Sequence, residues 1–314
     1  MAALLSSLLI FSFLSLGTPL SSNYYQKTCP NAESIIRKAV TDATKNDKTV
    51  PAGLLRMHFH DCFVRGCDGS VLLNSKGKNK AEKDGPPNVS LHAFYVIDNA
   101  KKALESAYFL APVYAHLRVY DVSGLIYMQS GGPSWDVPKG RKDGRTSKAS
   151  ESTQLPAPTF NISQLQQSFS QRGLSLEDLA ALSGAHTLGF SHCSSFNNRI
   201  HNFNSTTDID PSLQPSFAAS LRRVCPAKNN AKTAGVPMDP SSTTFDNTYY
   251  KLILQQKVLF SSDNALLGSP KTKSLVSKFA SSKDAFSKAF VKSMIKMSSI
   301  TGGQEIRKDC RVVN

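Results

Sequence analysis

The chain has 314 residues with 37 Lys and Arg against 23 Asp and Glu, which gives a formal net charge of +14. This length allows one large domain or two small ones with a sizeable core. The basic residues are scattered, without a dense run or interleaved aromatic side chains, so the composition does not favour a nucleic-acid-binding protein. The charge suits either a solvated basic surface or attraction to a polyanionic matrix.

The first predicted element is a cleaved secretory signal over residues 1–22. Its apolar run at Leu4–Leu16 is too short for a comfortable membrane span, and its first residues lack the usual positive charge. Cleavage is expected near residues 18–22. No other stretch is long and apolar enough to cross a bilayer. We therefore predict an exported, soluble protein with no membrane or nucleic-acid partner.

Helical patterns dominate the rest of the chain, and the alternation of apolar and polar residues that is typical of strands is scarce. The pattern predicts an all-α protein. Residues 136–158 are rich in Gly, Pro and Ser and are predicted to form ordered loops. Helices are expected at Ala32–Asn46, Pro51–Cys62, Ala93–Ser106, Ile162–Gln171, Leu176–Thr187, Pro215–Arg223, Thr248–Gln256, Thr272–Ala280 and Lys283–Ser298.

The second of these helices carries an arginine and a histidine four residues apart. Arg56 and His60 would lie one turn apart on the same face. A base and a fixed positive charge directed at one point can deprotonate a small acid and stabilise the anion that forms. The pair is therefore a candidate catalytic site.

Hard oxygen donors follow directly after the histidine. Asp61, Asp68 and Ser70 surround the short loop Cys62–Cys67, and donors of this kind suit a calcium ion. A zinc site in the H-x-H-x-C sequence His58–Cys62 is the alternative. That sequence lacks the second ligand pair that structural zinc sites normally have, so calcium is the preferred interpretation.

A second histidine lies near the end of a predicted helix far downstream. Ser175 and Asp178 form an S-x-x-D capping box, and leucines recur at helical spacing over residues 176–182. His186 falls on that apolar face. Taken alone, such a histidine is more often a packed core residue than a ligand.

The six cysteines of an exported chain indicate disulfide bonds. Six cysteines allow 15 pairings, and the sequence by itself does not decide among them. Sequons for N-glycosylation begin at Asn88, Asn161 and Asn204.

Together these features resemble the secreted plant haem peroxidases, a family also called class III peroxidases. The histidine segments Arg56–Ser70 and Leu182–Gly189 occur with further motifs in the order of that family. One such motif could arise by chance, but a whole series in this order could hardly do so. The further motifs are Tyr24–Pro30, Glu82–Asn88, Ser130–Trp135, Leu155–Pro158 and Phe245–Tyr250.

The resemblance implies one domain over residues 23–314 with the two-lobed peroxidase helical bundle, a distal lobe over about 23–135, a proximal lobe over about 136–314, and haem between them. It implies one haem b and two Ca²⁺ per chain. It also implies a monomeric, extracellular or cell-wall enzyme that reduces hydrogen peroxide to water and oxidises small phenolic donors, including lignin precursors, by one-electron steps. The basic surface would then favour a polyanionic wall matrix.

The resemblance implies His186 as the axial ligand of the haem iron, with Asp263 bonded to its other ring nitrogen. A carboxylate in that position increases the electron density that the imidazole donates. Without the family match, the preferred interpretation of Asp263 is a helix or turn cap.

On the open side of the haem, the resemblance implies that His60 accepts a proton from hydrogen peroxide and returns it to the departing oxygen. Arg56 would stabilise the developing negative charge. Asn88 would accept from the imidazole N–H, so we expect it to carry no glycan. Phe59 would limit access to the iron, and Pro156 would lie beside the donor site at the haem edge.

Two calcium sites follow from the same resemblance, and each interleaves acidic or hydroxyl side chains with turn carbonyls. Thr187 directly follows His186, so loss of the proximal ion should disturb the ligation of iron. Ser242 and Thr244 depend on the alignment of a short loop, and ordinary turn chemistry remains an alternative for Ser242. The distal ligands are Asp61, Val64 and Gly66 through their carbonyls, Asp68, Ser70, and Glu82 through water; the proximal ligands are Thr187, Asp239, Ser242, Thr244 and Asp246.

The resemblance stops between Glu105 and Ser130, although the flanking sequence matches on both sides. The family normally has a C-P-G-V-V-S-C-A-D-I-L-A-type core helix there. This chain lacks its two cysteines and the aspartate that pairs with the arginine matching Arg141. Such an abrupt loss suggests a mis-spliced exon boundary, or an insertion and deletion in a decaying gene.

The family pairing leaves the disulfides Cys62–Cys67 and Cys193–Cys225, while Cys29 and Cys310 lose their partners. These two are expected to be free thiols or to pair with each other. Each lost disulfide could cost about 2–5 kcal/mol. We therefore predict intact haem and calcium positions on a weakened scaffold.

Two rival interpretations come from other classes of function. A non-catalytic, poorly folded and haem-free product of an aberrant gene model or pseudogene is favoured only by segment 106–129. A basic structural protein of the cell wall rests on charge alone and leaves Arg56, His60 and His186 unexplained. The leading prediction is a secreted haem peroxidase.

Overall fold

The computed structural model describes residues 20–108, 129–228 and 233–314. Most of the predicted signal peptide, and nearly all of the aberrant segment between residues 106 and 129, lie outside the described residues. No helix in the described ranges has both the length and the apolar character that a membrane span requires.

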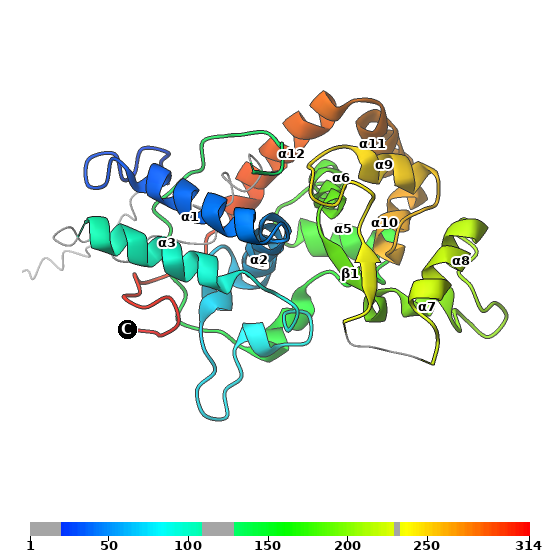
Figure 1. Ribbon diagram of the computed structural model, residues 1–314, viewed down its shortest axis with the longest axis horizontal. Coiled ribbons are helices and arrows are strands. Elements are labelled where there is room, and N and C mark those ends of the chain that lie inside the picture. The colour runs from blue at the N-terminus through cyan, green and yellow to red at the C-terminus, as the bar shows by residue number, and fades with distance from the viewer. Residues whose placement is uncertain (1–19, 109–128, 229–232) are drawn as a thin grey trace, which may run out of the picture.

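Helices make up most of the regular structure in these ranges, as predicted for an all-α protein (Figure 1). A short antiparallel pair, β1 (Phe190–His192) with β2 (Gly235–Pro237), adds a small sheet. The α-helices are α1 (Ala32–Asn46), α2 (Val50–Arg65), α3 (Phe94–Ala107), α5 (Ile162–Ser170), α6 (Leu176–Ser183), α7 (Asn197–Ile200), α8 (Pro215–Val224), α9 (Thr248–Leu254), α10 (Ser261–Ala265), α11 (Pro270–Ser281) and α12 (Lys283–Ser298). The 3₁₀-helices are η1 (Ser70–Leu72), η2 (Glu82–Asp84), η3 (Ala149–Gln154), η4 (Gly184–Thr187), η5 (Cys193–Ser195) and η6 (Leu266–Gly268).

Helix α2 contributes to two separate hydrophobic cores. Its residues Leu54 and Met57 pack in a core with α1 and α3, which lie side by side in Figure 1. Its residues Leu55 and Phe63 pack in a second core that α5, α6, α9, α11 and α12 share. Because apolar side chains anchor α2 on more than one side, the polar groups on its remaining face are held on a rigid support.

The predicted helix at 176–187 begins as expected but tightens before its end. The predicted capping box is confirmed, because the Ser175 hydroxyl accepts from the Asp178 N–H at 3.2 Å and the Asp178 carboxylate accepts from the Ser175 N–H at 2.7 Å. The α-helix ends at Ser183 and continues as η4. At Gly184 a Cβ atom would meet the Tyr250 hydroxyl and the Phe286 ring at 2.4 Å, so close packing requires glycine there. The predicted loop region 136–158 likewise contains η3.

The structure forms the disulfides Cys62–Cys67 and Cys193–Cys225. Cys29 and Cys310 are free thiols, so the alternative that they pair with each other is wrong for this structure. Both pack against the core between α1 and α3. Burial raises the pKa of both thiols, that of Cys310 to about 11, so both stay protonated at neutral pH.

Candidate active site

Helix α2 presents Arg56, Phe59 and His60 at the spacing of one helical face. The helix starts at Val50 with Pro51 in its first turn, where the missing N–H of proline has no cost. His60 is buried, while Arg56 and Phe59 are partly exposed. The Phe59 ring stands edge-on to the His60 ring at 5.6 Å. The predicted distal residues therefore share one face of a well-anchored helix.

The segment after η2 fixes the protonation of His60. Asn88 donates its amide N–H to the Glu82 carbonyl at 2.7 Å, so its amide oxygen faces His60 Nδ1 at 2.5 Å. This arrangement makes Nδ1 the donor and leaves Nε2 as the basic nitrogen. Burial, and then the charge of Arg56, lower the pKa of His60 to about 3, so the imidazole is a neutral base at physiological pH. Since Asn88 is only 1% exposed, its sequon cannot carry a glycan in the folded chain.

Arg56 supplies positive charge close to this base. Its guanidinium donates to the Ser90 hydroxyl at 2.9 Å and to the Pro87 carbonyl at 2.7 Å. Burial lowers its pKa to about 10, which still leaves it charged at neutral pH. Neither hydrogen-bond partner is a carboxylate, so its charge is available to an anion in the site.

His186 lies at the end of α6, in η4, and its Nδ1 is 2.7 Å from Asp263 Oδ1. Asp263 is 2% exposed and also accepts from the Tyr249 hydroxyl at 2.8 Å and from the Phe260 N–H at 3.2 Å. The rings of Tyr249 and Phe260 stand edge-on to the imidazole at 5.9 and 5.3 Å. These contacts orient the ring, while 40% of the His186 side chain stays exposed.

Tyr249 and Phe260 have no role in the sequence prediction, although they lie in or beside the motifs and site residues that it names. Tyr249 lies in the motif Phe245–Tyr250, and Phe260 lies three residues before Asp263. The only available signal was their position in or beside these segments. Their contacts with His186 depend on the packing of α9 and α10, which local sequence does not show.

A family model described as "Peroxidase" matches residues 36–282. The chain is 64% identical over 298 residues to Peroxidase 64 of Arabidopsis thaliana, with 94% of this chain and 93% of that relative covered. The chain belongs to the plant haem peroxidase family. This peroxidase is also 49% identical over 315 residues to Peroxidase 66 of the same plant, with 98% and 97% covered. It is 44% identical over 319 residues to Peroxidase 5 of Vitis vinifera, with 99% and 97% covered.

The family makes the chain an oxidoreductase, and haem is the cofactor that the family implies. The residues present fit that group. His186 has Nδ1 engaged by a buried carboxylate and Nε2 without a hydrogen bond in the described ranges, as a metal-ligating histidine requires. The non-catalytic and structural interpretations are not favoured.

A second polar cluster of the peroxidase lies behind His60. Asp61, Asp68, Ser70 and Glu82 are each at most 2% exposed. Burial, and then repulsion from Asp61, raise the pKa of Glu82 to about 9. Within the described ranges, the Glu82 carboxylate oxygens and the Ser70 hydroxyl have no hydrogen bond of good geometry. Buried oxygens of this kind fit a divalent cation, which would compensate the carboxylates.

The structure also brings together part of the predicted proximal calcium set. The Thr187 hydroxyl, next to His186, is 2.6 Å from Asp239 Oδ2 and 3.3 Å from Asp246 Oδ1. Burial raises the pKa of Asp239. Ser242 contributes a carbonyl that accepts from the Gly189 N–H at 2.8 Å.

The short loop between Asp239 and Asp246 contains the predicted ligands Ser242 and Thr244. Ser241, which the sequence prediction did not name, donates to Asp239 at 3.1 Å. Thr244 is exposed, and neither its side chain nor that of Ser242 bonds to these carboxylates among the described residues. A hydroxyl two positions after Asp239 was visible in the sequence, but the choice between neighbouring serines depends on the loop backbone.

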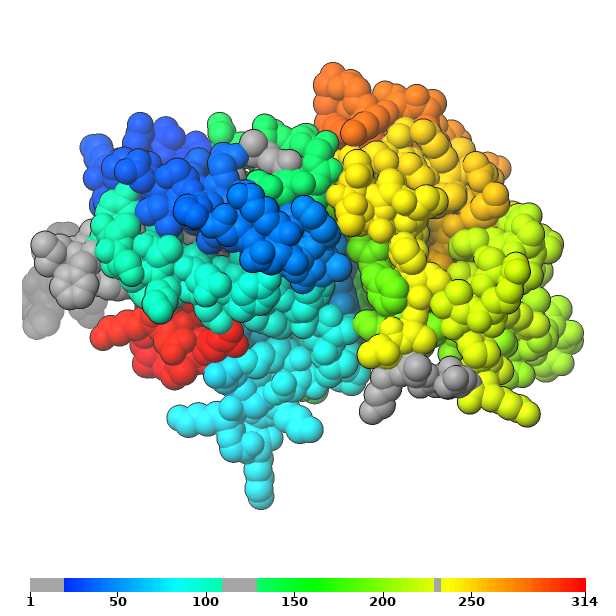
Figure 2. Space-filling view, in the orientation of Figure 1, coloured from blue at the N-terminus to red at the C-terminus, as the bar shows by residue number. Residues whose placement is uncertain are grey.

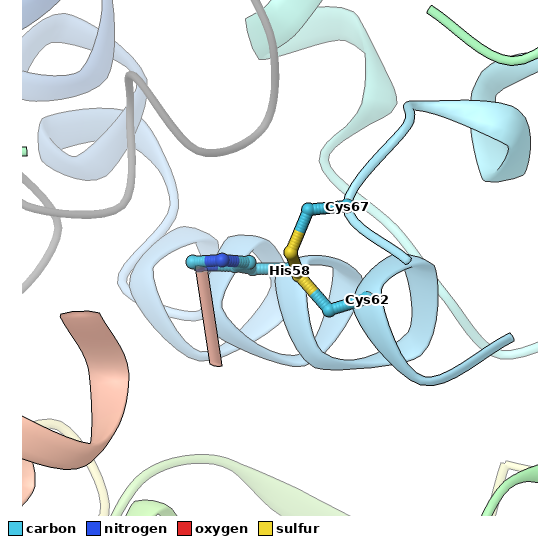
Figure 3. Close-up of side chains that lie close together, drawn as sticks. All are labelled: His58, Cys62 and Cys67. Carbon is cyan, nitrogen blue, oxygen red and sulfur yellow. A yellow bond between two sulfur atoms is a disulfide. The ribbon is translucent and has the colours of Figure 1, made fainter. Parts of the chain in front are cut away.

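The zinc alternative is wrong for this structure. Figure 3 shows His58 beside Cys62 and Cys67 on α2 and the loop that follows it. The two sulfur atoms form a disulfide, so neither can supply a thiolate to a metal. His58 Nε2 is instead 3.1 Å from the Ser298 hydroxyl.

Pro156 lies partly exposed in the loop that follows η3. The preceding Leu155 is buried in the same core as Phe63 of α2. At the other end of the loop, the Pro158 carbonyl accepts from the Ser262 N–H at 2.9 Å, one residue before Asp263. The loop is therefore attached both to the core beside α2 and to the helix that orients His186.

Proposed function

We propose that this peroxidase binds one haem b through His186 and uses it to reduce hydrogen peroxide to water while oxidising phenolic donors. The observation that carries the proposal is a matched pair of histidines. His60 is a buried neutral base beside Arg56, and His186 is bonded to the buried carboxylate of Asp263. Bound haem would supply the redox chemistry, in which a two-electron reduction of peroxide is balanced by two one-electron oxidations of donors.

The residues of α2 would handle the proton and the charge. His60 Nε2 would take a proton from hydrogen peroxide and then give it to the departing oxygen. The hydrogen bond from Nδ1 to Asn88 keeps the imidazole in the tautomer that this transfer needs. The Arg56 guanidinium would stabilise negative charge as the O–O bond breaks.

On the other side, Asp263 would make His186 a stronger donor of electron density. A carboxylate that accepts the Nδ1 proton gives the imidazole imidazolate character. The further hydrogen bond from Tyr249 and the edge contact of Phe260 hold both groups in place. This arrangement favours O–O cleavage over simple ligand binding.

We also propose two calcium ions. The distal ion would be held by Asp61, Asp68 and Ser70 with the carbonyls of Val64 and Gly66, and by Glu82 through water. The burial of this cluster supports it, as do the Glu82 carboxylate and Ser70 hydroxyl oxygens, which have no hydrogen bond of good geometry among the described residues. The proximal ion would be held by Thr187, Asp239 and Asp246, together with Ser242 and Thr244 or with Ser241 in the place of one of them.

Chelation of calcium is expected to lower the melting temperature of the haem-loaded protein by roughly 5–10 °C. A ligand at about 100 times its Kd stabilises a fold by about 2.7 kcal/mol, and each kcal/mol shifts Tm by roughly 2–4 °C in a chain of this size. Differential scanning calorimetry with and without EGTA measures the shift. Asp68→Ala should reduce it, while Asp284→Asn, an exposed change on α12, should leave it intact. An unchanged wild-type Tm in EGTA would contradict the calcium proposal.

For location and partners, we propose an extracellular monomer that acts on small phenols and is retained by a polyanionic wall matrix. The apolar N-terminal segment and the net charge of +14 support this proposal. Retention of this kind weakens with salt, because ions screen exposed charges.

The absorption spectrum of the purified protein, refolded with haemin, calcium and a thiol redox couple, tests the function. We expect a Soret band that changes on addition of one equivalent of hydrogen peroxide and returns after two equivalents of a simple phenol. A protein that binds no haem, or a Soret band that peroxide leaves unchanged, would refute the proposed function.

A further inference from the structure

Arg172 joins three segments of the chain, two of which lead to the proposed donor site. Its Nε donates to the Phe63 carbonyl at 2.6 Å, its Nη1 to the Ser168 carbonyl at 2.8 Å, and its Nη2 to the Gln154 carbonyl at 3.3 Å. These carbonyls lie in the last turn of α2, in the last turn of α5 and at the end of η3. One side chain therefore connects α2 with η3 and α5, which lie far from it in the sequence.

The chemistry of the contact is specific for a guanidinium. The carbonyls at helix ends carry partial negative charge, which favours a cation. The guanidinium also lies 4.9 Å from the centre of the Phe63 ring, at a distance suited to a cation–π contact. A lysine has the charge but lacks the planar fork that reaches three carbonyls at once.

Two of these contacts lead directly to the proposed donor site. Phe63 lies one turn after Phe59 on α2, and their ring centres are 4.4 Å apart. Gln154 lies two residues before Pro156. Arg172 thus holds both the helical turn behind Phe59 and the start of the loop that carries Pro156.

We propose that Arg172 is a positioning residue for donor binding. It fixes Phe59 and Pro156 relative to each other, while it takes no part in the reaction with hydrogen peroxide. The inference rests on the proposed function, which places the donor beside Pro156. It is separable from that function, because His60, Arg56 and His186 make no hydrogen bond to Arg172.

The test compares Arg172→Gln and Arg172→Lys with the wild type, each loaded with haem. We expect the dissociation constant of a simple phenol, read from the difference spectrum of the resting haem, and its KM to rise on the order of 10-fold in both variants. The rate of reaction with peroxide in the absence of donor should stay unchanged. Arg223→Gln removes the same charge from an exposed position on α8 and should change none of these values.

Chemical rescue provides a second readout that a general loss of stability would not give. Arg172 lines an open cavity of about 350 Å³ together with Arg65, Gln154 and Gln171, so a small cation can reach its place. In Arg172→Ala, added guanidinium at millimolar concentration should restore donor affinity, whereas sodium at the same ionic strength should not.

Unchanged donor affinity in a folded Arg172→Gln protein would overturn the inference, as would an equal loss in the peroxide and donor steps. If the glutamine variant does not fold, Arg172→Lys and the guanidinium rescue decide the question by the same measures. A wild-type protein that fails to react with peroxide would instead refute the proposed function itself.

Discussion

Replacing His60 by alanine is expected to lower the second-order rate constant for reaction with hydrogen peroxide by about 10²–10⁴-fold, the usual contribution of a positioned acid–base group. The pKa of about 3 keeps the native imidazole neutral and ready to accept the proton. Alanine removes the base but leaves Arg56 and His186 in place, so haem content should not change. Stopped-flow absorption without donor measures the rate constant.

Two further variants sharpen this result. Asn88→Ala keeps the imidazole but removes the acceptor of its Nδ1 proton, so we expect a smaller loss than in the His60 variant. His201→Gln changes a histidine that bonds to the Cys225 carbonyl, and it should react like the wild type. A His60→Ala protein that reacts with peroxide at the native rate would show that another group is the base.

Replacing His186 by alanine is expected to weaken haem binding by at least about 100-fold. Loss of even an outer hydrogen-bond partner of a metal ligand costs 10–100-fold, so loss of the proposed ligand itself should cost more. The alanine removes one of the two partners of Asp263 Oδ1, which keeps only the Tyr249 hydroxyl; since Asp263 is 2% exposed, this loss should also lower stability. Titration of the haem-free protein with haemin, followed at the Soret band, gives the affinity.

Exogenous imidazole distinguishes a lost ligand from a damaged fold. It should restore part of the haem affinity in His186→Ala, since the variant leaves a cavity of the right chemistry beside Asp263. Asp263→Asn should keep haem bound with a shifted Soret band, because the amide is a poorer acceptor for the Nδ1 proton. Native haem affinity in His186→Ala would show that the ligand is elsewhere.

The helices were predictable because their signals are local. The capping box at Ser175 marks the start of α6, and the structure contains both of its hydrogen bonds. The end of α6 was not predictable in the same way. The change to η4 occurs at Gly184, where Tyr250 of α9 and Phe286 of α12 approach the backbone closely.

The two halves of the proposed site differ in how much of their geometry the sequence alone predicts. Arg56 and His60 lie four residues apart on one helix, so helical geometry alone places them on one face. His186 and Asp263 are 77 positions apart, and only the family resemblance joined them. Asp263 in fact satisfies both interpretations, because one carboxylate oxygen accepts from the Phe260 N–H as a cap and the other meets His186.

The sequence by itself determined the helical class, the Arg56–His60 pair, and the acidic and hydroxyl residues around the loop Cys62–Cys67 that follows it. Each of these depends on neighbours within a helical turn or a short loop. Tertiary structure decided the partners of those groups. Asn88 sets the tautomer of His60, Tyr249 supports Asp263, and Arg172 bonds to three separate segments. These contacts arise where side chains from distant parts of the chain meet in a packed interior, and no local pattern of residues encodes that meeting.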